Sequence, residues 1–159
     1  MKKLYLINVL LFSLILTACR TTQNQSSEHS TQAKYLPDQF SKLYLGMTLK
    51  DFCKVKDVNK MTISTISSFR TEYEEQINDK TYKSVVYYLD NDNNHPLYEL
   101  IIEYQSSFDL ANYISTKYGN PNSGSNWIFD SGEGFKIKIW TFDYKLVITG
   151  VIKGTEWDE

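Results

Sequence analysis

The stretch Leu97-Tyr98-Glu99-Leu100-Ile101-Ile102-Glu103-Tyr104 decides the fold class of this chain. Its even-numbered positions are apolar or aromatic, and Glu99 and Glu103 occupy two of the odd positions between them. An alternation of this kind is typical of a β-strand that buries one face and turns the other toward solvent. We therefore predict a half-buried strand at residues 97–104, with both glutamates on its solvent side.

Further strands are predicted before and after this one. Residues 82–89 are rich in β-branched and aromatic side chains, and the polar run 90–96 that follows has the composition of a hairpin loop. Residues 63–77 place several apolar side chains on one parity and are predicted as a single strand. Toward the C-terminus, strands are predicted at residues 126–130, 135–142 and 144–152.

A first short helix is predicted from its cap and its spacing. It begins after Thr48, a good N-cap residue, and ends around Val55 or Lys56. Its buried face is predicted to consist of the residues with i, i+3, i+4 spacing, namely Leu49, Phe52 and Cys53.

A second helix is predicted over residues 108–118. Ser107 is its predicted N-cap, Gly119 supplies the left-handed residue that ends it, and Pro121 prevents its continuation. The predicted apolar stripe consists of Leu110, Ala111, Ile114 and Tyr118.

The predicted order of elements is therefore α-β-β-β-α-β-β-β. Antiparallel hairpins with helices packed against them make an α+β fold, here one antiparallel sheet of about six strands with two short helices on one face. A length of 159 residues fits a single domain. An aromatic content of 14% is too high for a disordered chain, and a net charge of −2 argues against a nucleic-acid partner.

Residues 1–18 have the organisation of a secretory signal peptide. Lys2 and Lys3 form a positive start, and the apolar run that follows, Leu4–Leu16, has 13 residues. A permanent spanning helix needs about 20 apolar residues, so this run is too short to be one.

The residues Leu16-Thr17-Ala18-Cys19 resemble the lipobox of bacterial lipoproteins. In that family the cysteine thiol receives a diacylglyceryl group, the signal is cut before the cysteine, and the new amino group is acylated. The resemblance implies a lipid on Cys19 that holds the protein on a membrane. Arg20, in place of the aspartate of inner-membrane retention, favours the outer membrane, or the plasma membrane in a monoderm host. The alternative is an ordinary secretory signal in which Cys19 has no role.

The chain after the signal is predicted to have two parts. Residues 19–36 are the lipidated cysteine and a flexible tether, because serine, threonine, glutamine and asparagine dominate them. Residues 37–159 are the single α+β domain.

The sequence offers few groups for catalysis or metal binding. The two histidines are His29, in the predicted tether, and His95, in the predicted hairpin loop. Cys53 is the one thiol besides Cys19 and is expected to be buried. No Cys-x-x-Cys or helical histidine pair is present, and the acidic run 90–94 lacks the glycine and the glutamate of a calcium loop. We therefore predict no enzymatic activity, no metal and no cofactor.

Two short motifs carry a second resemblance. Gly46-Met47-Thr48 and Lys117-Tyr118-Gly119-Asn120-Pro121 resemble motifs of small cell-envelope domains of the BamE and β-lactamase-inhibitor-like type. The resemblance implies a non-enzymatic domain of the cell envelope and assigns no site residue.

Together these observations predict a membrane-anchored lipoprotein with a protein-binding or assembly role in the bacterial envelope. Two alternatives remain open: a hydrolase of envelope material that uses His95 and carboxylates, and a surface-exposed adhesin or inhibitor-type binding module. The partner surface is predicted from residues 135–144, where apolar parity changes from odd to even positions. Both series cannot face the helices unless a bulge or bend intervenes. The candidate partner surface is therefore Trp140, Phe142 and Tyr144.

Overall fold

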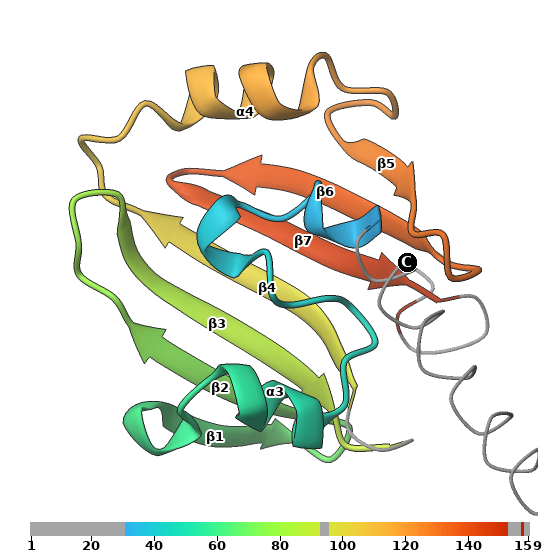
Figure 1. Ribbon diagram of the computed structural model, residues 1–159. Coiled ribbons are helices and arrows are strands. Elements are labelled where there is room, and N and C mark those ends of the chain that lie inside the picture. Colours follow the sequence, from blue (N-terminus) through green and yellow to red (C-terminus); the bar gives the residue numbers. More distant parts are fainter. Residues whose placement is uncertain (1–30, 93–95, 153–156, 158–159) are drawn as a thin grey trace, which may run out of the picture.

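The computed structural model describes residues 31–92, 96–152 and Trp157. They form one antiparallel sheet with short helices packed against it, so the α+β class with a single antiparallel sheet is confirmed (Figure 1). The sheet has seven strands rather than about six, in the order β1-β2-β3-β4-β7-β6-β5. Every pair of neighbouring strands is antiparallel.

The seven strands lie close to the predicted ranges, with one addition. They are β1 (Thr62–Ser67), β2 (Arg70–Gln76), β3 (Tyr82–Asp90), β4 (Leu97–Tyr104), β5 (Trp127–Asp130), β6 (Lys136–Phe142) and β7 (Lys145–Val151). The additional strand arises because the range predicted as one strand, 63–77, folds as the hairpin β1–β2, in which Ser67 pairs with Arg70. Ser68 and Phe69 form its turn without glycine or asparagine, so composition did not mark it.

The helical elements include both predicted helices. They are η1 (Asp38–Phe40), α3 (Leu49–Val55), η2 (Val58–Lys60) and α4 (Leu110–Tyr118). Thr48 caps α3 as predicted and accepts a hydrogen bond from the Asp51 N–H at 3.2 Å. The predicted cap of the second helix, Ser107, is wrong: Asp109 caps α4 and accepts from the Asn112 N–H at 3.1 Å.

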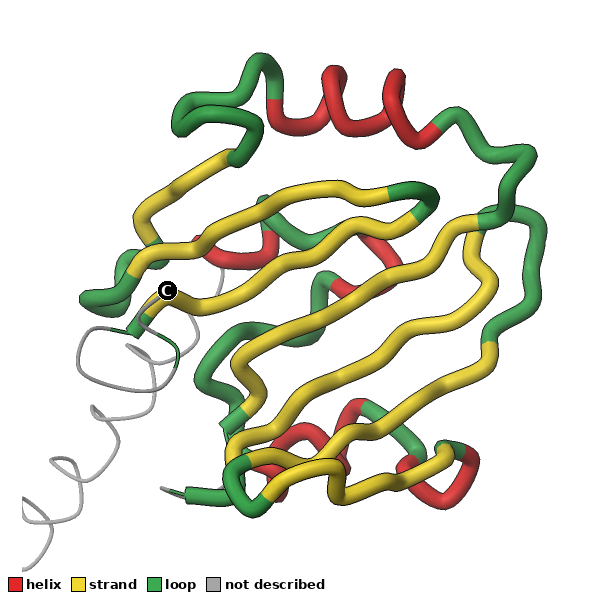
Figure 2. Tube along the Cα trace, turned by 180° about the vertical axis from the view of Figure 1, so that it is seen from behind, coloured by secondary structure: helices red, strands yellow, loops and turns green. Residues whose placement is uncertain are grey.

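The sheet has two faces with different surroundings, which we call the covered face and the open face. The covered face packs against residues 31–48 and α3, and α4 lies along the β5–β6 edge of the sheet (Figure 1). Its buried side chains include Tyr73, Val85, Tyr87, Leu100, Ile102, Ile137, Ile139, Leu146 and Ile148. Seen from behind, no described helix crosses the open face (Figure 2).

The predicted buried face of α3 is only partly correct. Phe52 is fully buried and meets the rings of Tyr73 and Tyr87 at centroid distances of 5.8 and 5.0 Å. Leu49 is half-buried and also contacts the core. Cys53, expected to be buried, is exposed, because α3 has only seven residues and Phe52 occupies the position closest to the sheet.

The predicted tether ends too late. Residues 31–33 are helical, and Gln32 is only 1% exposed. The Gln32 side-chain amide accepts a hydrogen bond from the Leu45 N–H at 2.9 Å and donates to the Leu45 carbonyl at 3.3 Å. The Gln32 amide therefore bonds Leu45 as a neighbouring strand would. The buried N–H and carbonyl of Leu45 both have a hydrogen-bond partner as a result. Leu36 is also buried, so residues 31–36 belong to the folded domain.

Two local irregularities differ from the predicted alternation. In β4 the register shifts opposite Tyr88 and Leu89, which leaves Tyr98 as an extra residue that packs against the Tyr88 ring on the open face. In β6 a bulge or bend was predicted, and there is no bulge, because the pairing with β7 is continuous from Lys136 to Phe142. The two apolar series lie on opposite faces instead: Ile137 and Ile139 face the core, and Trp140 and Phe142 follow Lys136 and Lys138 on the open face.

Candidate partner-binding surface

The three predicted surface residues lie at one end of the β6–β7 hairpin. Ile137 and Ile139 point into the core from the covered face, so alternation places Trp140 and Phe142 on the open face. Trp140 is half-buried there and Phe142 is 43% exposed. Tyr144, in the turn, is 49% exposed. We call residues 141–144 the tip.

The tip has a well-defined backbone although its aromatic side chains are exposed. Asp143 and Tyr144 form a two-residue turn between β6 and β7, and Asp143 adopts a φ of 51°. Aspartate tolerates this left-handed conformation better than most residues. The Tyr144 carbonyl accepts a hydrogen bond from the Tyr104 N–H at 2.8 Å, which fixes the turn to the end of β4.

Lysines lie beside the two rings on the open face. The Lys145 Nζ is 5.4 Å from the centroid of the Phe142 ring, and the Lys138 Nζ is 5.5 Å from that of Trp140. Exposed cation–π contacts of this kind contribute about 0.5–1 kcal/mol each. They restrict the rings before any partner arrives, which lowers the entropy lost on binding.

A groove of about 330 Å³ opens beside the tip, between β6 and α4. Its apolar wall consists mainly of Leu110 and Ile114 from α4 and Trp127 from β5. Thr141 and Asp143 of the tip also line it, as do Ala111, Ser115 and residues 119–121. The Trp127 indole N–H donates to the Gly119 carbonyl at 3.1 Å and so holds the end of α4 against β5.

The described chain begins at the opposite end of β6 from the tip. Thr31 packs against Gly132, and the Gln32 Nε2 donates to the Glu133 Oε1 at 2.9 Å. Both contacts are with the β5–β6 turn. Since β6 has seven residues, the tip lies about 20 Å from this turn at about 3.3 Å per residue.

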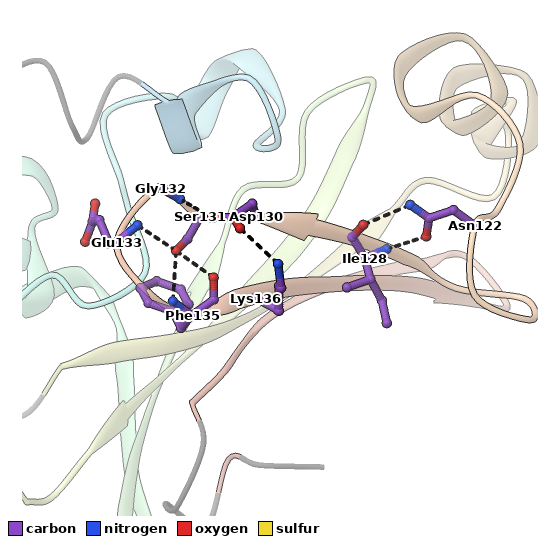
Figure 3. Close-up of polar contacts among 8 residues, drawn as sticks. All are labelled: Asn122, Ile128, Asp130, Ser131, Gly132, Glu133, Phe135 and Lys136. Carbon is purple, nitrogen blue, oxygen red and sulfur yellow. Dashed lines mark hydrogen bonds and ion pairs between the residues drawn. The ribbon is translucent and has the colours of Figure 1, made fainter.

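The β5–β6 turn itself is tightly cross-linked by polar contacts (Figure 3). The Ser131 hydroxyl donates to the Phe135 carbonyl at 2.8 Å and accepts from the Glu133 N–H at 3.0 Å. Lys136 and Asp130 form an ion pair at 2.9 Å across the turn. This turn is therefore a well-ordered contact site for the segment at residues 31–36.

The structure does not assemble the acidic residues of β4 into a cleft. Glu103 pairs with Lys83 at 2.6 Å, and neither Glu99 nor Glu103 lines the groove. Burial raises the pKa of Glu99, and the Arg70 charge partly opposes this rise. Glu99 is therefore less exposed than the solvent-side position predicted for it.

The structure bears only in part on the histidines, cysteines and acidic residues considered for catalysis or metal binding. His29 and His95 lie outside the described residues, as does Cys19. Among residues 31–92, 96–152 and 157, no group of three or more histidine, cysteine, aspartate or glutamate side chains could hold a metal ion. Within that same part of the chain, no helix is long and apolar enough to cross a membrane.

Sequence reasoning missed the groove and part of the open face. The groove joins α4 to β6, and no local pattern reports a contact between them. On the open face the Trp157 ring stacks on Tyr98 at a centroid distance of 3.3 Å, and its indole N–H donates to Asp90 at 2.9 Å. An aromatic residue near the chain end was the only available signal for this contact.

Comparison with known proteins supplies no relative for this arrangement. No protein-family model, no curated protein and no solved structure matches the chain. The resemblances to lipoproteins and to BamE-type envelope domains therefore remain predictions from their motifs.

Proposed function

We propose that this chain is a bacterial lipoprotein, anchored through a lipid on Cys19, that binds an envelope protein at the tip without catalysis. The observation that supports this most is the exposure of Phe142 and Tyr144 on a turn whose backbone is fixed. Tyrosine and phenylalanine bury a large area with few rotatable bonds, which makes them effective anchors in interfaces.

The position of the tip also supports the proposal. Eleven residues, 20–30, separate Cys19 from Thr31, so the lipid lies within about 40 Å of Thr31 even along a fully extended chain. Thr31 lies at the β5–β6 turn, so the anchor would hold that end near the membrane. The tip lies about 20 Å from that turn, so a tether of this reach lets it face away from the membrane, where a partner can reach it. Arg20 favours the outer membrane for this anchor, or the plasma membrane in a monoderm host.

Lipidation is tested on the native protein by mass spectrometry. We expect a mature N-terminus at Cys19 that carries acyl chains, and a Cys19→Ala variant that no longer fractionates with membranes. An intact Lys2–Lys3 terminus in the mature protein would contradict the anchor.

Partner binding is tested by photo-crosslinking in native membranes. A photoreactive residue placed at Tyr144 should give a discrete adduct with another protein. The same residue at Asn59, which is exposed on η2, is the matched control and should give none. Absence of an adduct from Tyr144, or the same adduct from both positions, would refute the proposed role of the tip.

A further inference from the structure

The edge of β6 is only partly covered by β5. The pairing of β5 with β6 runs from Asp130–Lys136 to Trp127–Ile139 and stops there. The last three residues of β6, Trp140–Phe142, continue beside β7 alone. No described strand lies on the other side of them.

The main chain of Thr141 faces this uncovered side. The Ile128 N–H and carbonyl point away from β6, since both are bonded to the Asn122 side chain, at 2.7 and 2.8 Å. Main-chain direction alternates along an antiparallel strand, so Trp127 must exchange its hydrogen bonds with Ile139. Thr141 is two residues beyond Ile139 and therefore directs its N–H and carbonyl to the same side, past the end of β5.

The neighbouring edge of β5 is already blocked at Ile128. The Asn122 amide occupies both outward main-chain groups of Ile128, as a paired strand would (Figure 3). Blocking of this kind is a common way to prevent strand addition. The contrast leaves Thr141, beside the groove, as a position where an incoming strand would find main-chain groups without such a block.

The groove lies directly beside this edge. Thr141 is one of its lining residues, and Leu110, Ile114 and Trp127 provide apolar contacts for a large side chain. Asp143 is the only charged residue of the lining. The carbonyl end of α4, at Gly119, also lies there and adds partial negative charge. The groove is thus complementary to an apolar residue with basic neighbours.

We propose that the tip binds its partner by strand addition: an extended segment pairs with the main chain of Thr141, places one large apolar side chain in the groove, and sets a lysine or arginine near Asp143. Main-chain hydrogen bonds provide the affinity in this mode, and the pocket for alternate side chains provides the specificity. The inference rests on the proposed function, because it names the chemistry of the partner at the same tip.

The test measures binding of a defined peptide to the full chain in phosphatidylcholine nanodiscs, with empty discs as the blank. The probe is fluorescein-labelled Thr-Lys-Thr-Phe-Thr-Lys-Thr, whose phenylalanine and two lysines share one face when extended. Thr141→Pro removes the outward N–H, and Thr141→Val is the matched control that keeps it. We expect Thr141→Pro to weaken binding about tenfold or more and Thr141→Val to change it less than about twofold.

Two further variants examine the groove without altering the strand. Ala111→Phe, on the α4 side of the groove, should fill it and weaken binding as strongly as Thr141→Pro. Asp143→Asn keeps a residue that tolerates the left-handed conformation. It should weaken binding about threefold at low salt and less at about 0.5 M salt. Circular dichroism melts of each variant identify any that fail to fold.

Three results would overturn strand addition. They are no binding of the peptide to the wild-type chain, equal binding by folded Thr141→Pro and wild type, and unchanged binding when glutamate replaces both peptide lysines. A partner that still crosslinks from Tyr144 in the Thr141→Pro chain would refute this inference and leave the proposed function standing. Peptide binding without any crosslinked partner would refute the proposed function instead.

Discussion

Both faces of β6 carry large apolar side chains and yet have opposite surroundings, and the open face also carries Lys136 and Lys138. Ile137 and Ile139 are buried on the covered face. On the open face, Trp140 is half-buried and Phe142 is exposed. The difference comes from residues 31–48 and the helices, which cover only one side of the sheet (Figures 1 and 2). A large apolar side chain alone therefore does not tell which side of a strand forms the core. The covering segment decides it, and the remaining aromatics become available for recognition.

The largest expected effect separates the two faces by stability. Phe52→Ala should lower the free energy of unfolding by about 3–5 kcal/mol, because it opens a cavity between α3 and the rings of Tyr73 and Tyr87. Phe142→Ala should lower it by less than about 1 kcal/mol, because that ring is already in contact with solvent. Urea unfolding followed by circular dichroism measures both. Equal losses would mean that the open face is also a core.

The next effect concerns the segment that covers the sheet. Gln32→Ala should cost about 2–3 kcal/mol, since it leaves the buried N–H and carbonyl of Leu45 without their partners. Gln39→Ala, at an exposed position, is the control and should change stability little. Thermal melts of the two variants give the comparison. If the Gln32→Ala variant melts at the same temperature as the wild type, residues 31–36 do not contribute to the folded domain and belong to the tether.

A smaller effect should come from a buried hydroxyl on the covered face. The Tyr87 hydroxyl donates to Glu75 at 2.6 Å, and Lys56 pairs with the same carboxylate at 2.7 Å. Tyr87→Phe removes a hydrogen bond to a charged group, so a loss of about 1.5–3 kcal/mol is expected. Tyr144→Phe, at the exposed tip, should be neutral. If both variants unfold at the same urea concentration, the buried network contributes nothing.

The smallest effect depends on pH and lies on the open face. Burial raises the pKa of Glu99 above its ordinary value of 4.5, so the native state holds this proton more tightly than the unfolded chain does. The stability that protonated Glu99 contributes is fully present below the pKa of Glu99 in the unfolded chain. It is lost as the pH rises through the pKa of Glu99 in the native state. Glu99→Gln should therefore be more stable than the wild type at pH 7, and the difference should vanish near pH 4. A difference that is constant with pH would contradict this.

Much of the fold follows from local patterns, and the misses have physical reasons. The strands and both helices were placed by periodicity, and Thr48 by its capping geometry. The hairpin at Ser68 was missed because parity continues through it. Gln32 was misassigned because a glutamine that replaces a strand partner looks like a tether residue in the sequence. The exposure of Cys53 depends on how a short helix sits on the sheet, which spacing does not specify.

The candidate site shows the same limits. Parity alone identified Trp140 and Phe142 as residues that avoid the helices, although the reason is a strand with apolar residues on both faces rather than a bulge. Thr141 and Asp143 could not be recognised, because their interest depends on where β5 ends and on the approach of α4. Such contacts join parts of the chain that share no pattern.

The most direct test of the tip as a binding surface measures stability and binding on the same variant. Phe142 and Tyr144 are replaced together by alanine, and the affinity for the protein crosslinked from Tyr144 is measured beside urea unfolding. We predict that binding weakens about tenfold or more while the free energy of unfolding stays within about 1 kcal/mol of the wild type. Unchanged binding, or a loss of stability as large as that of Phe52→Ala, would contradict the account.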